Sequence, residues 1–197
     1  MKSGKKKFIK LAIFASFFFL CFSFYFFQKE LRRPVLPVLG KVQKFFLVNS
    51  EGKPVSLENL KGKVWIADFF FTTCSGICPI MSKHMAALQR SFEAVPGVVL
   101  VSISVNPETD SSAILKQYAQ KFKADTKKWY FLTGSSETIT QLAVKSFKLG
   151  AINEPVFHSS YFSLVDRQAQ IRGYYDGTKT EEINRLFRDA AQLLKEK

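Results

Sequence analysis

Residues 64–79 read VWIADFFFTTCSGICP, and this stretch decides the fold of the chain. Residues 64–71 are almost continuously apolar, which is typical of a strand buried on both faces. A short loop then carries Cys74 and Cys78, and Pro79 follows at once. Proline is favoured as the first residue of a helix, because its missing N–H group would have no partner there. The stretch therefore predicts a buried strand, a two-cysteine loop, and a helix whose N-cap is Cys78.

The start of that helix gives the two cysteines their expected chemistry. Free backbone N–H groups and the positive end of the helix dipole stabilise a thiolate, which lowers the pKa of a cysteine from about 8.5. Gly76 allows the loop to turn tightly enough to bring the two sulfurs together. Two thiols of low pKa can exchange with disulfides or bind a soft metal. A purely structural disulfide is the alternative, but it would close a very short loop and stabilise the fold little.

Strand and helix patterns alternate along the rest of the chain. We expect further strands at residues 44–49, 98–105 and 129–132, and helices at residues 79–92, 111–122 and 135–147. A hairpin over residues 161–175 turns at Arg167 and Gln168, and a last helix presents an apolar face of Ile183, Leu186, Phe187, Ala190 and Leu194. The alternation predicts an α/β fold with helices on both faces of a central mixed sheet, largely parallel and completed by an antiparallel hairpin.

The N-terminal residues differ from the rest of the chain. Of the 21 Phe residues in the 197-residue sequence, nine fall within the first 27 positions. Residues 11–27 hold no charged side chain, and with the residues back to Phe8 they approach the ~20 residues that span a bilayer. No cleavage site of small residues follows, and the bulky residues before Cys21 do not suit lipoprotein processing. We therefore expect an uncleaved transmembrane helix rather than a signal peptide.

Charge and proline content complete the domain organisation. The lysines that precede the apolar run favour a cytoplasmic N-terminus, so that residues 1–28 form a cytoplasmic tail and membrane anchor. Residues 29–40 form a linker, in which two prolines disfavour helix, and residues 41–197 form one globular domain. The chain has a formal net charge of +13, but the domain holds 21 Lys and Arg against 15 Asp and Glu. These scattered charges indicate a solvated surface rather than a nucleic-acid site, with an acidic protein partner as the alternative.

Four motifs, in the same order along the chain, resemble those of the Sco/SenC family. FxTxCxxxCP begins at Phe70, SVNPETD occupies residues 104–110, LTG residues 132–134 and HSS residues 158–160. The resemblance spans roughly residues 41–194, nearly all of the expected domain. It implies a thioredoxin-like fold and a protein of the bacterial or mitochondrial inner membrane that delivers copper to the binuclear CuA centre of cytochrome c oxidase.

By that resemblance, Cys74, Cys78 and His158 are the copper ligands, for Cu(I) or Cu(II). The residue chemistry agrees, because soft thiolates and a neutral imidazole suit Cu(I), and three ligands leave room for a sulfur of the recipient. The expected recipient is the oxidase subunit that carries CuA, with a thiol reductant or another copper chaperone as a further partner. The expected location is the bacterial inner membrane, with the domain on the extracytoplasmic side.

Three further polar residues support or modify the hypothesis of a copper site. Asp68 lies six residues before Cys74, the offset at which thioredoxins place a carboxylate that moves protons for their dithiol; a structural acid held by backbone or a lysine is the alternative. The family usually has Asp where this chain has Asn106, a difference that should alter the charge and redox behaviour of the site. Asp110 follows the family pattern, or serves as the N-cap of the next helix.

Met81, His84 and Met85 share one helix face and form a second group of soft donors. We expect the two methionines in the core and His84 near the surface, with an auxiliary copper contact as the alternative. The main hypothesis is a membrane-tethered copper chaperone, which is not chiefly an enzyme. A thiol–disulfide oxidoreductase that uses Cys74 and Cys78 as a redox-active pair is the main alternative, and a redox or copper sensor is a third.

Overall fold

The computed structural model describes residues 14, 18–24, 34–149 and 159–196. The chain divides into two compact units, Met1–Val35 and Leu36–Lys197. In the first unit, residues 14 and 18–24 are helical, and most of the expected anchor lies outside the described residues. No helix among the described residues has both the length and the apolar character needed to cross a membrane.

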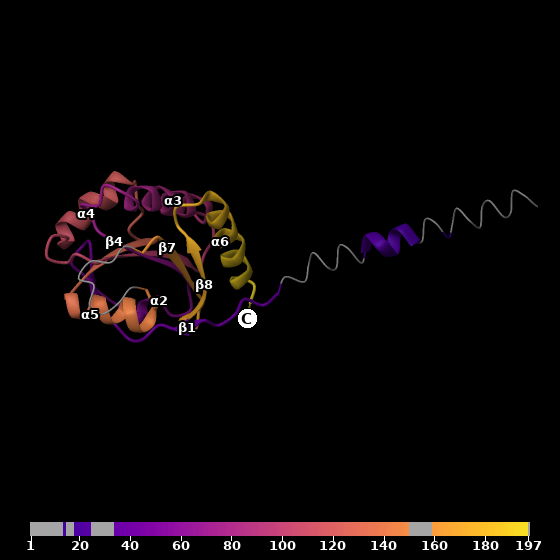
Figure 1. The fold of residues 1–197 in the computed structure, drawn as a ribbon, viewed down its shortest axis with the longest axis horizontal. Coiled ribbons are helices and arrows are strands. Elements are labelled where there is room, and N and C mark those ends of the chain that lie inside the picture. Colours follow the sequence, from indigo (N-terminus) through magenta and orange to yellow (C-terminus); the bar gives the residue numbers. More distant parts are fainter. Residues whose placement is uncertain (1–13, 15–17, 25–33, 150–158, 197) are drawn as a thin grey trace, which may run out of the picture. The chain divides into compact units, whose positions relative to one another are not determined.

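A mixed sheet of eight strands forms the centre of the second unit, in the part of the chain that the structure describes (Figure 1). Its order is β1-β8-β7-β4-β5-β6-β2-β3. The strands are β1 (Gly40–Lys41), β2 (Phe46–Asn49), β3 (Pro54–Ser56), β4 (Val64–Phe70), β5 (Val98–Ser104), β6 (Trp129–Thr133), β7 (Tyr161–Val165) and β8 (Gln170–Asp176). The strands expected from the sequence are all present, and the short β1 and β3 were not expected.

Parallel pairing is confined to the centre of this sheet. Among the described strands, only the β4–β5 and β5–β6 pairs are parallel. The other pairs are antiparallel, because β7 returns alongside β4 and the β2–β3 hairpin joins β6 through β2. The expectation of a largely parallel sheet was therefore wrong, whereas that of a mixed sheet is confirmed.

Helices cover both faces of the sheet (Figure 1). One face packs against α3 (Cys78–Ser91), α4 (Ser112–Lys121) and α6 (Thr180–Leu193). The opposite face packs against α2 (Leu57–Leu60), α5 (Ser136–Gln141) and the π-helical η1 (Leu142–Ser146). We expected one α-helix over residues 135–147, but it changes to π-helix at Leu142, and the N–H of Phe147 donates to the Leu142 carbonyl (3.1 Å).

The central strand β4 explains why its sequence is so apolar. All seven of its residues are buried, because successive side chains point to opposite faces and each face has a helical cover. Val64, Ile66 and Phe70 join the cluster beneath α3, whereas Trp65, Ala67 and Phe69 join the other cluster. Asp68 has the same parity as Ile66 and Phe70, so the strand presents this carboxyl group to the α3 face.

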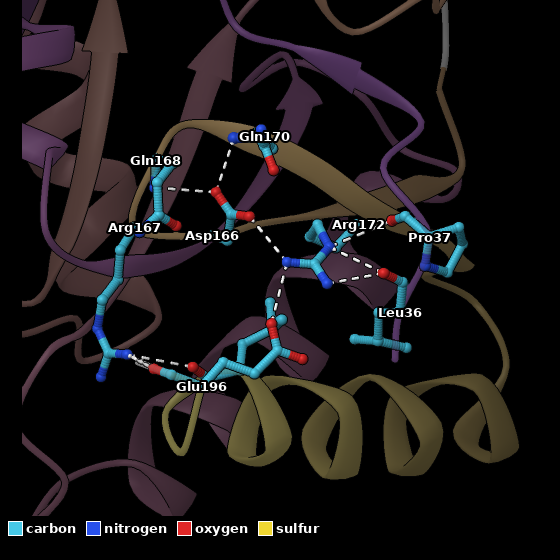
Figure 2. A network of polar contacts seen from close by, with 9 residues as sticks. Leu36, Pro37, Asp166, Arg167, Gln168, Gln170, Arg172 and Glu196 are labelled. Carbon is cyan, nitrogen blue, oxygen red and sulfur yellow. Dashed lines mark hydrogen bonds and ion pairs between the residues drawn. The ribbon is translucent and has the colours of Figure 1, made fainter. Parts of the chain in front are cut away.

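Ion pairs and hydrogen bonds connect both ends of the second unit to the β7–β8 hairpin (Figure 2). Arg172 is buried and forms ion pairs with Asp166 (2.9 Å) and Glu196 (3.1 Å). Its guanidinium also donates to the backbone carbonyls of Leu36 and Pro37. The hairpin, which turns where the sequence predicts, thus holds both the end of the linker and the residues after α6.

Candidate functional site

The two cysteines lie in the loop after β4 and at the start of α3. The N–H of Cys74 donates to the carbonyl of Phe71 (3.2 Å), which turns the chain as it leaves the strand. Cys78 is the first residue of α3 and Pro79 the second, while Ile77 is the N-cap and makes no side-chain cap. The prediction of Cys78 as N-cap was therefore wrong by one residue, because the helix takes in one more residue before the proline.

The two thiols, both free, have opposite character. Burial acts to raise the pKa of the Cys74 thiol, but hydrogen bonds from the N–H and side chain of Cys78 and from the N–H groups of Gly76 and Ile77 lower the pKa overall. Burial raises the pKa of Cys78 to about 12, helped by the neighbouring Cys74. The expectation of two thiols of low pKa therefore holds for Cys74 alone. The site pairs a half-buried thiol with a buried one, since Cys78 is only 3% exposed.

A buried carboxylate ties the cysteine loop to the loop after β5. Asp110 is fully buried and accepts hydrogen bonds from the N–H (3.0 Å) and the hydroxyl of Thr72. It also accepts from the hydroxyl of Ser104 (2.6 Å). The alternative role as helix N-cap was wrong, because the cap of α4 is Ser111, whose Oγ accepts from Ile114. Asp110 instead fixes the backbone two residues before Cys74.

Asp68 is the last acceptor in a buried series of hydrogen bonds on the α3 face of the sheet. Trp129 Nε1–H donates to Ser102 Oγ (2.8 Å), and the Ser102 hydroxyl donates to Asp68 Oδ1 (2.6 Å). Burial raises the pKa of Asp68 to about 7, against the hydrogen bond from Ser102, which lowers it. The partner of Asp68 is thus a serine hydroxyl, not a lysine. A carboxylate at this position also acts to raise the pKa of Cys78, so the two groups interact electrostatically.

His158 lies outside the described residues, but the sheet register limits where the chain resumes. Strands β4 and β7 are antiparallel, with Ala67 opposite Ser163, so β7 begins at the end of the sheet where β4 finishes. Ser159, the residue after His158, is buried, and its Oγ accepts from the N–H of Tyr161 (3.2 Å). The residues that directly follow His158 therefore lie at the same end of the sheet as the cysteine loop. The described part of the chain contains no group of three His, Cys, Asp or Glu side chains arranged to hold a metal.

Comparison with known proteins assigns the family. Residues 39–195 match the SCO1/SenC family model, which is most of the chain. The chain belongs to the SCO1/SenC family. It is 39% identical over 160 residues to a SCO1 protein homolog of Bacillus subtilis, covering 78% of this chain and 82% of that protein.

Solved Sco structures agree with this SCO1/SenC fold. BsSco, described as a Sco-family cytochrome c oxidase assembly protein with a disulfide switch, is 37% identical, with a TM-score of 0.74 over 84% of this chain and all of its own. Arabidopsis thaliana ScoI, solved with copper bound, is 28% identical, with a TM-score of 0.65 over 81% of this chain and 99% of its own. The thioredoxin-like architecture expected for the domain is thus confirmed.

Asn106, where the sequence resemblance leads us to expect Asp, uses its backbone in the turn after β5. Its N–H donates to Ser104 Oγ (3.1 Å), and its carbonyl accepts from the N–H groups of Thr109 and Asp110. An aspartate could make the same backbone bonds. The change from Asp to Asn therefore alters the charge beside the site and leaves the turn intact.

The helix face that carries Met81, His84 and Met85 is mainly structural. Both methionines are fully buried, as the sequence predicts. His84 is half-buried, and its Nδ1 lies 2.8 Å from the carbonyl of Gly177. The described residues around it form no metal-binding cluster.

Sequence reasoning missed the hydroxyl partners of the two buried carboxylates. Ser102 and Ser104 interrupt an otherwise apolar strand at alternate positions, so both face the α3 side, where they bind Asp68 and Asp110. Two polar residues with period-two spacing in a buried strand are the signal that could have identified them.

Proposed function

We propose that this chain is a membrane-anchored copper chaperone that binds copper through Cys74, Cys78 and His158 and matures the CuA centre of cytochrome c oxidase. The observation that carries the proposal is the pair of free thiols at the end of β4 in a chain of the SCO1/SenC family. Structures of family members have been solved with copper bound, and BsSco is described as a cytochrome c oxidase assembly protein.

The thiols fit a soft, monovalent metal. Burial acts to raise the pKa of Cys74, but backbone N–H groups of Gly76, Ile77 and Cys78 lower it overall, which favours the thiolate form that binds metals. Copper itself can displace the proton of the buried Cys78, as thiol ligands are deprotonated when they bind metals. Thiolate and imidazole ligands suit Cu(I), and a half-exposed Cys74 leaves one side of the site open to a recipient.

The test is an anaerobic Cu(I) titration of the reduced full-length chain in detergent micelles, read by competition with a chromogenic Cu(I) chelator. We expect one tight site, which is weakened at least tenfold by His158→Ala and by Cys78→Ser. Cys21→Ser is the matched control for the loss of a cysteine, and its affinity should equal that of the wild type. Affinity that is unchanged in His158→Ala would refute the three-ligand assignment.

Delivery needs a separate experiment. Copper-loaded chain is mixed with the apo form of a CuA-bearing oxidase domain, samples are oxidised with ferricyanide at intervals, and the purple absorption of the mixed-valence CuA is measured. We expect transfer from the wild-type chain and none from Cys78→Ser loaded to the same total copper. Binding without transfer would favour a storage or sensing role instead.

Asp68 favours thiol–disulfide exchange as the second candidate function. A carboxyl group whose pKa is raised to about 7 by burial, on the face that bears Cys78, can accept a proton near neutral pH. In this reaction, the Cys74 thiolate attacks a substrate disulfide and forms a mixed disulfide. Cys78 then loses its proton to Asp68 and attacks Cys74 Sγ, so the substrate leaves as a dithiol and the Cys74–Cys78 pair is oxidised.

The two functions separate at His158 and Asp68. A reductase should retain its rate of disulfide exchange in His158→Ala and lose at least tenfold in Asp68→Ala at pH 7. A chaperone should lose copper affinity in His158→Ala and retain it in Asp68→Ala. The measurement is the reduction of a peptide disulfide by the pre-reduced chain under single-turnover conditions.

We also propose that residues 11–27 anchor the chain in the bacterial inner membrane with the domain on the outer side. The basis is the uncharged run and the lysines that precede it. The chain should resist extraction from membranes by alkaline carbonate, and protease added to spheroplasts should digest the domain. Extraction with carbonate would contradict the anchor, and protection from protease would contradict the orientation.

A further inference from the structure

The backbone of Gly177 links α3, the helix that begins with Cys78, to the residues that precede β7. Its carbonyl accepts a hydrogen bond from His84 Nδ1 on α3 (2.8 Å). Its N–H donates to the carbonyl of Ser160 (2.6 Å), the second residue after His158. One turn between β8 and α6 therefore connects α3, whose first residue is Cys78, with the segment that leads out of His158.

The hydrogen bond fixes the state of the imidazole. A carbonyl oxygen only accepts, so Nδ1 of His84 carries the proton, and the neutral ring has its lone pair on Nε2. Protonation of Nε2 leaves the Nδ1–H donor in place. The link therefore persists in both charge states of the ring.

Close packing requires glycine at this turn. A Cβ atom added to Gly177 would lie 3.1 Å from the Ser160 carbonyl oxygen and 3.0 Å from the Met81 methyl carbon. Both distances are shorter than ordinary van der Waals contacts, and Met81 is fully buried beneath the turn. Any larger residue would push the Ser160 carbonyl away from the Gly177 N–H.

The start of β7 has few other backbone partners among the described strands. The β4–β7 ladder covers Ser163 to Val165 but not the two residues before them. Tyr161 and Phe162 pair only with β8 in the described sheet. The bond from Gly177 to Ser160 extends that pairing by one step toward His158.

We propose that His84 and Gly177 are positioning residues that hold the segment following His158 in fixed relation to α3 and its cysteine. The proposal rests on the function proposed above, in which Cys78 and His158 bind the same ion. The link consists of two hydrogen bonds, one from the Gly177 N–H to the Ser160 carbonyl and one from the His84 imidazole to the Gly177 carbonyl. It holds Ser160 in a fixed position relative to α3 before copper arrives, which reduces the entropy lost when the metal binds through His158.

Hydrogen exchange of the metal-free, reduced full-length chain tests the link directly. We expect His84→Ala and Gly177→Ala to speed amide exchange about fivefold or more in peptides that cover residues 159–163 and 174–178. Peptides from β5 should exchange at the wild-type rate. His84→Asn retains a donor near the position of Nδ1 and should restore slow exchange. Lys83→Ala, at the exposed neighbouring position of α3, is the control for the helix. Exchange that is unchanged in both variants, or faster throughout the domain, would overturn the proposal.

Copper affinity tests the consequence through a double-mutant cycle. His84→Ala should lower the Cu(I) affinity about fivefold in the wild-type background and less than twofold in the His158→Ala background, because the link acts through His158. An equal loss in both backgrounds would overturn the proposal, since His84 would then act on the dithiol or on the fold. If His158→Ala alone leaves the affinity unchanged, the ligand assignment fails, and the exchange rates still decide whether the link exists.

Discussion

At the scale of single residues, two buried carboxyl groups near the dithiol are held in contrasting ways. Asp110 accepts three hydrogen bonds, from Thr72 and Ser104. Asp68 accepts one side-chain bond, from Ser102, in an otherwise apolar environment. Three hydrogen bonds hold the Asp110 carboxyl group in place, whereas desolvation favours the neutral form of Asp68. The first group therefore has a structural role, and the second can change its charge near neutral pH.

The Asp110→Asn variant should be less stable than the wild type by about 2 kcal/mol. The amide has one acceptor oxygen for three donors, and its NH2 group would face a donor, which leaves buried polar groups unsatisfied. Chemical denaturation of the full chain in detergent measures the free energy of unfolding. Glu108→Gln, at an exposed position of the same loop, is the control and should change that energy by less than about 0.5 kcal/mol. A stability equal to that of the wild type would show that the Asp110 bonds contribute nothing.

Asp68→Asn should stabilise the metal-free, reduced chain increasingly as the pH rises. The pKa of Asp68 is raised by burial from 3.8 to about 7, so the unfolded state ionises first and wild-type stability falls between about pH 4 and pH 7. The stability gained in the variant should grow by about 1.4 kcal/mol per pH unit, reaching roughly 4 kcal/mol above pH 7. Unfolding free energies of both chains at pH 5, 6, 7 and 8 measure this slope. A difference that does not vary with pH would contradict the raised pKa.

At the scale of elements, the loop before α3 and the first residue of the helix make the two thiols unequal. Burial acts to raise the pKa of Cys74, but N–H groups of Gly76, Ile77 and Cys78 lower it overall, whereas burial raises that of Cys78 to about 12. Because only a thiolate is alkylated rapidly, Cys74 should react with iodoacetamide at pH 7 at least tenfold faster than Cys78. Peptide mass spectrometry of the Cys21→Ser chain measures both rates. The single variants Cys74→Ser and Cys78→Ser should retain this order, and equal rates would contradict it.

The sequence was sufficient to predict most elements of the domain because periodicity and burial agree there. The run over residues 64–71 is apolar because β4 has helices on both faces, and this is visible in the sequence. The change to π-helix at Leu142 was not predicted, and Phe147, whose N–H closes the π-turn, packs against Trp65 and Phe69, contacts that the local sequence does not reveal. The antiparallel pairings were missed for a related reason, because a strand pattern does not reveal the direction of its neighbour.

The candidate site was only partly predictable for physical reasons. The spacing of Cys74 and Cys78 is local, and a loop followed by a helix is enough to bring them together. The roles of Asp110 and Gly177 depend on contacts with residues 38 and 17 positions away in the sequence, Thr72 and Ser160. Such contacts are set by the sheet register, so they emerge only in the folded chain. The unequal thiols likewise result from burial by tertiary packing.

At the scale of the whole molecule, the Arg172 network joins the two ends of the second unit (Figure 2). Arg172 contacts Asp166, Glu196 and the carbonyls of Leu36 and Pro37, and the neighbouring Arg167 donates to carbonyls at the end of the chain. The guanidinium distributes its donors over several acceptors at once, which a lysine does not do. The network therefore makes the stability of the domain depend on its terminal residues.

Arg172→Ala should cost about 3 kcal/mol or more in the free energy of unfolding, because it leaves Asp166 buried without its ion pair. Arg172→Lys should recover part of that loss. Limited proteolysis should cut near residues 34–39 sooner in both variants. Lys179→Ala, which removes an exposed pair with Asp176, is the matched control and should change the unfolding energy by less than about 1 kcal/mol. Resistance to protease equal to that of the wild type would refute the anchoring role.

The outermost strands of the described sheet, β1 and β3, affect whether two copies of this domain can pair edge to edge. At one margin, β1 is two residues long, and at the other, β3 is three residues long and begins with Pro54, which has no N–H to donate. Strands this short offer little template on which a second sheet could grow, and beyond Ile171 the Tyr174 carbonyl of β8 accepts a hydrogen bond from Arg185. Even crowded at high local concentration, neighbouring copies of this domain should therefore remain separate molecules and not merge their sheets into aggregates.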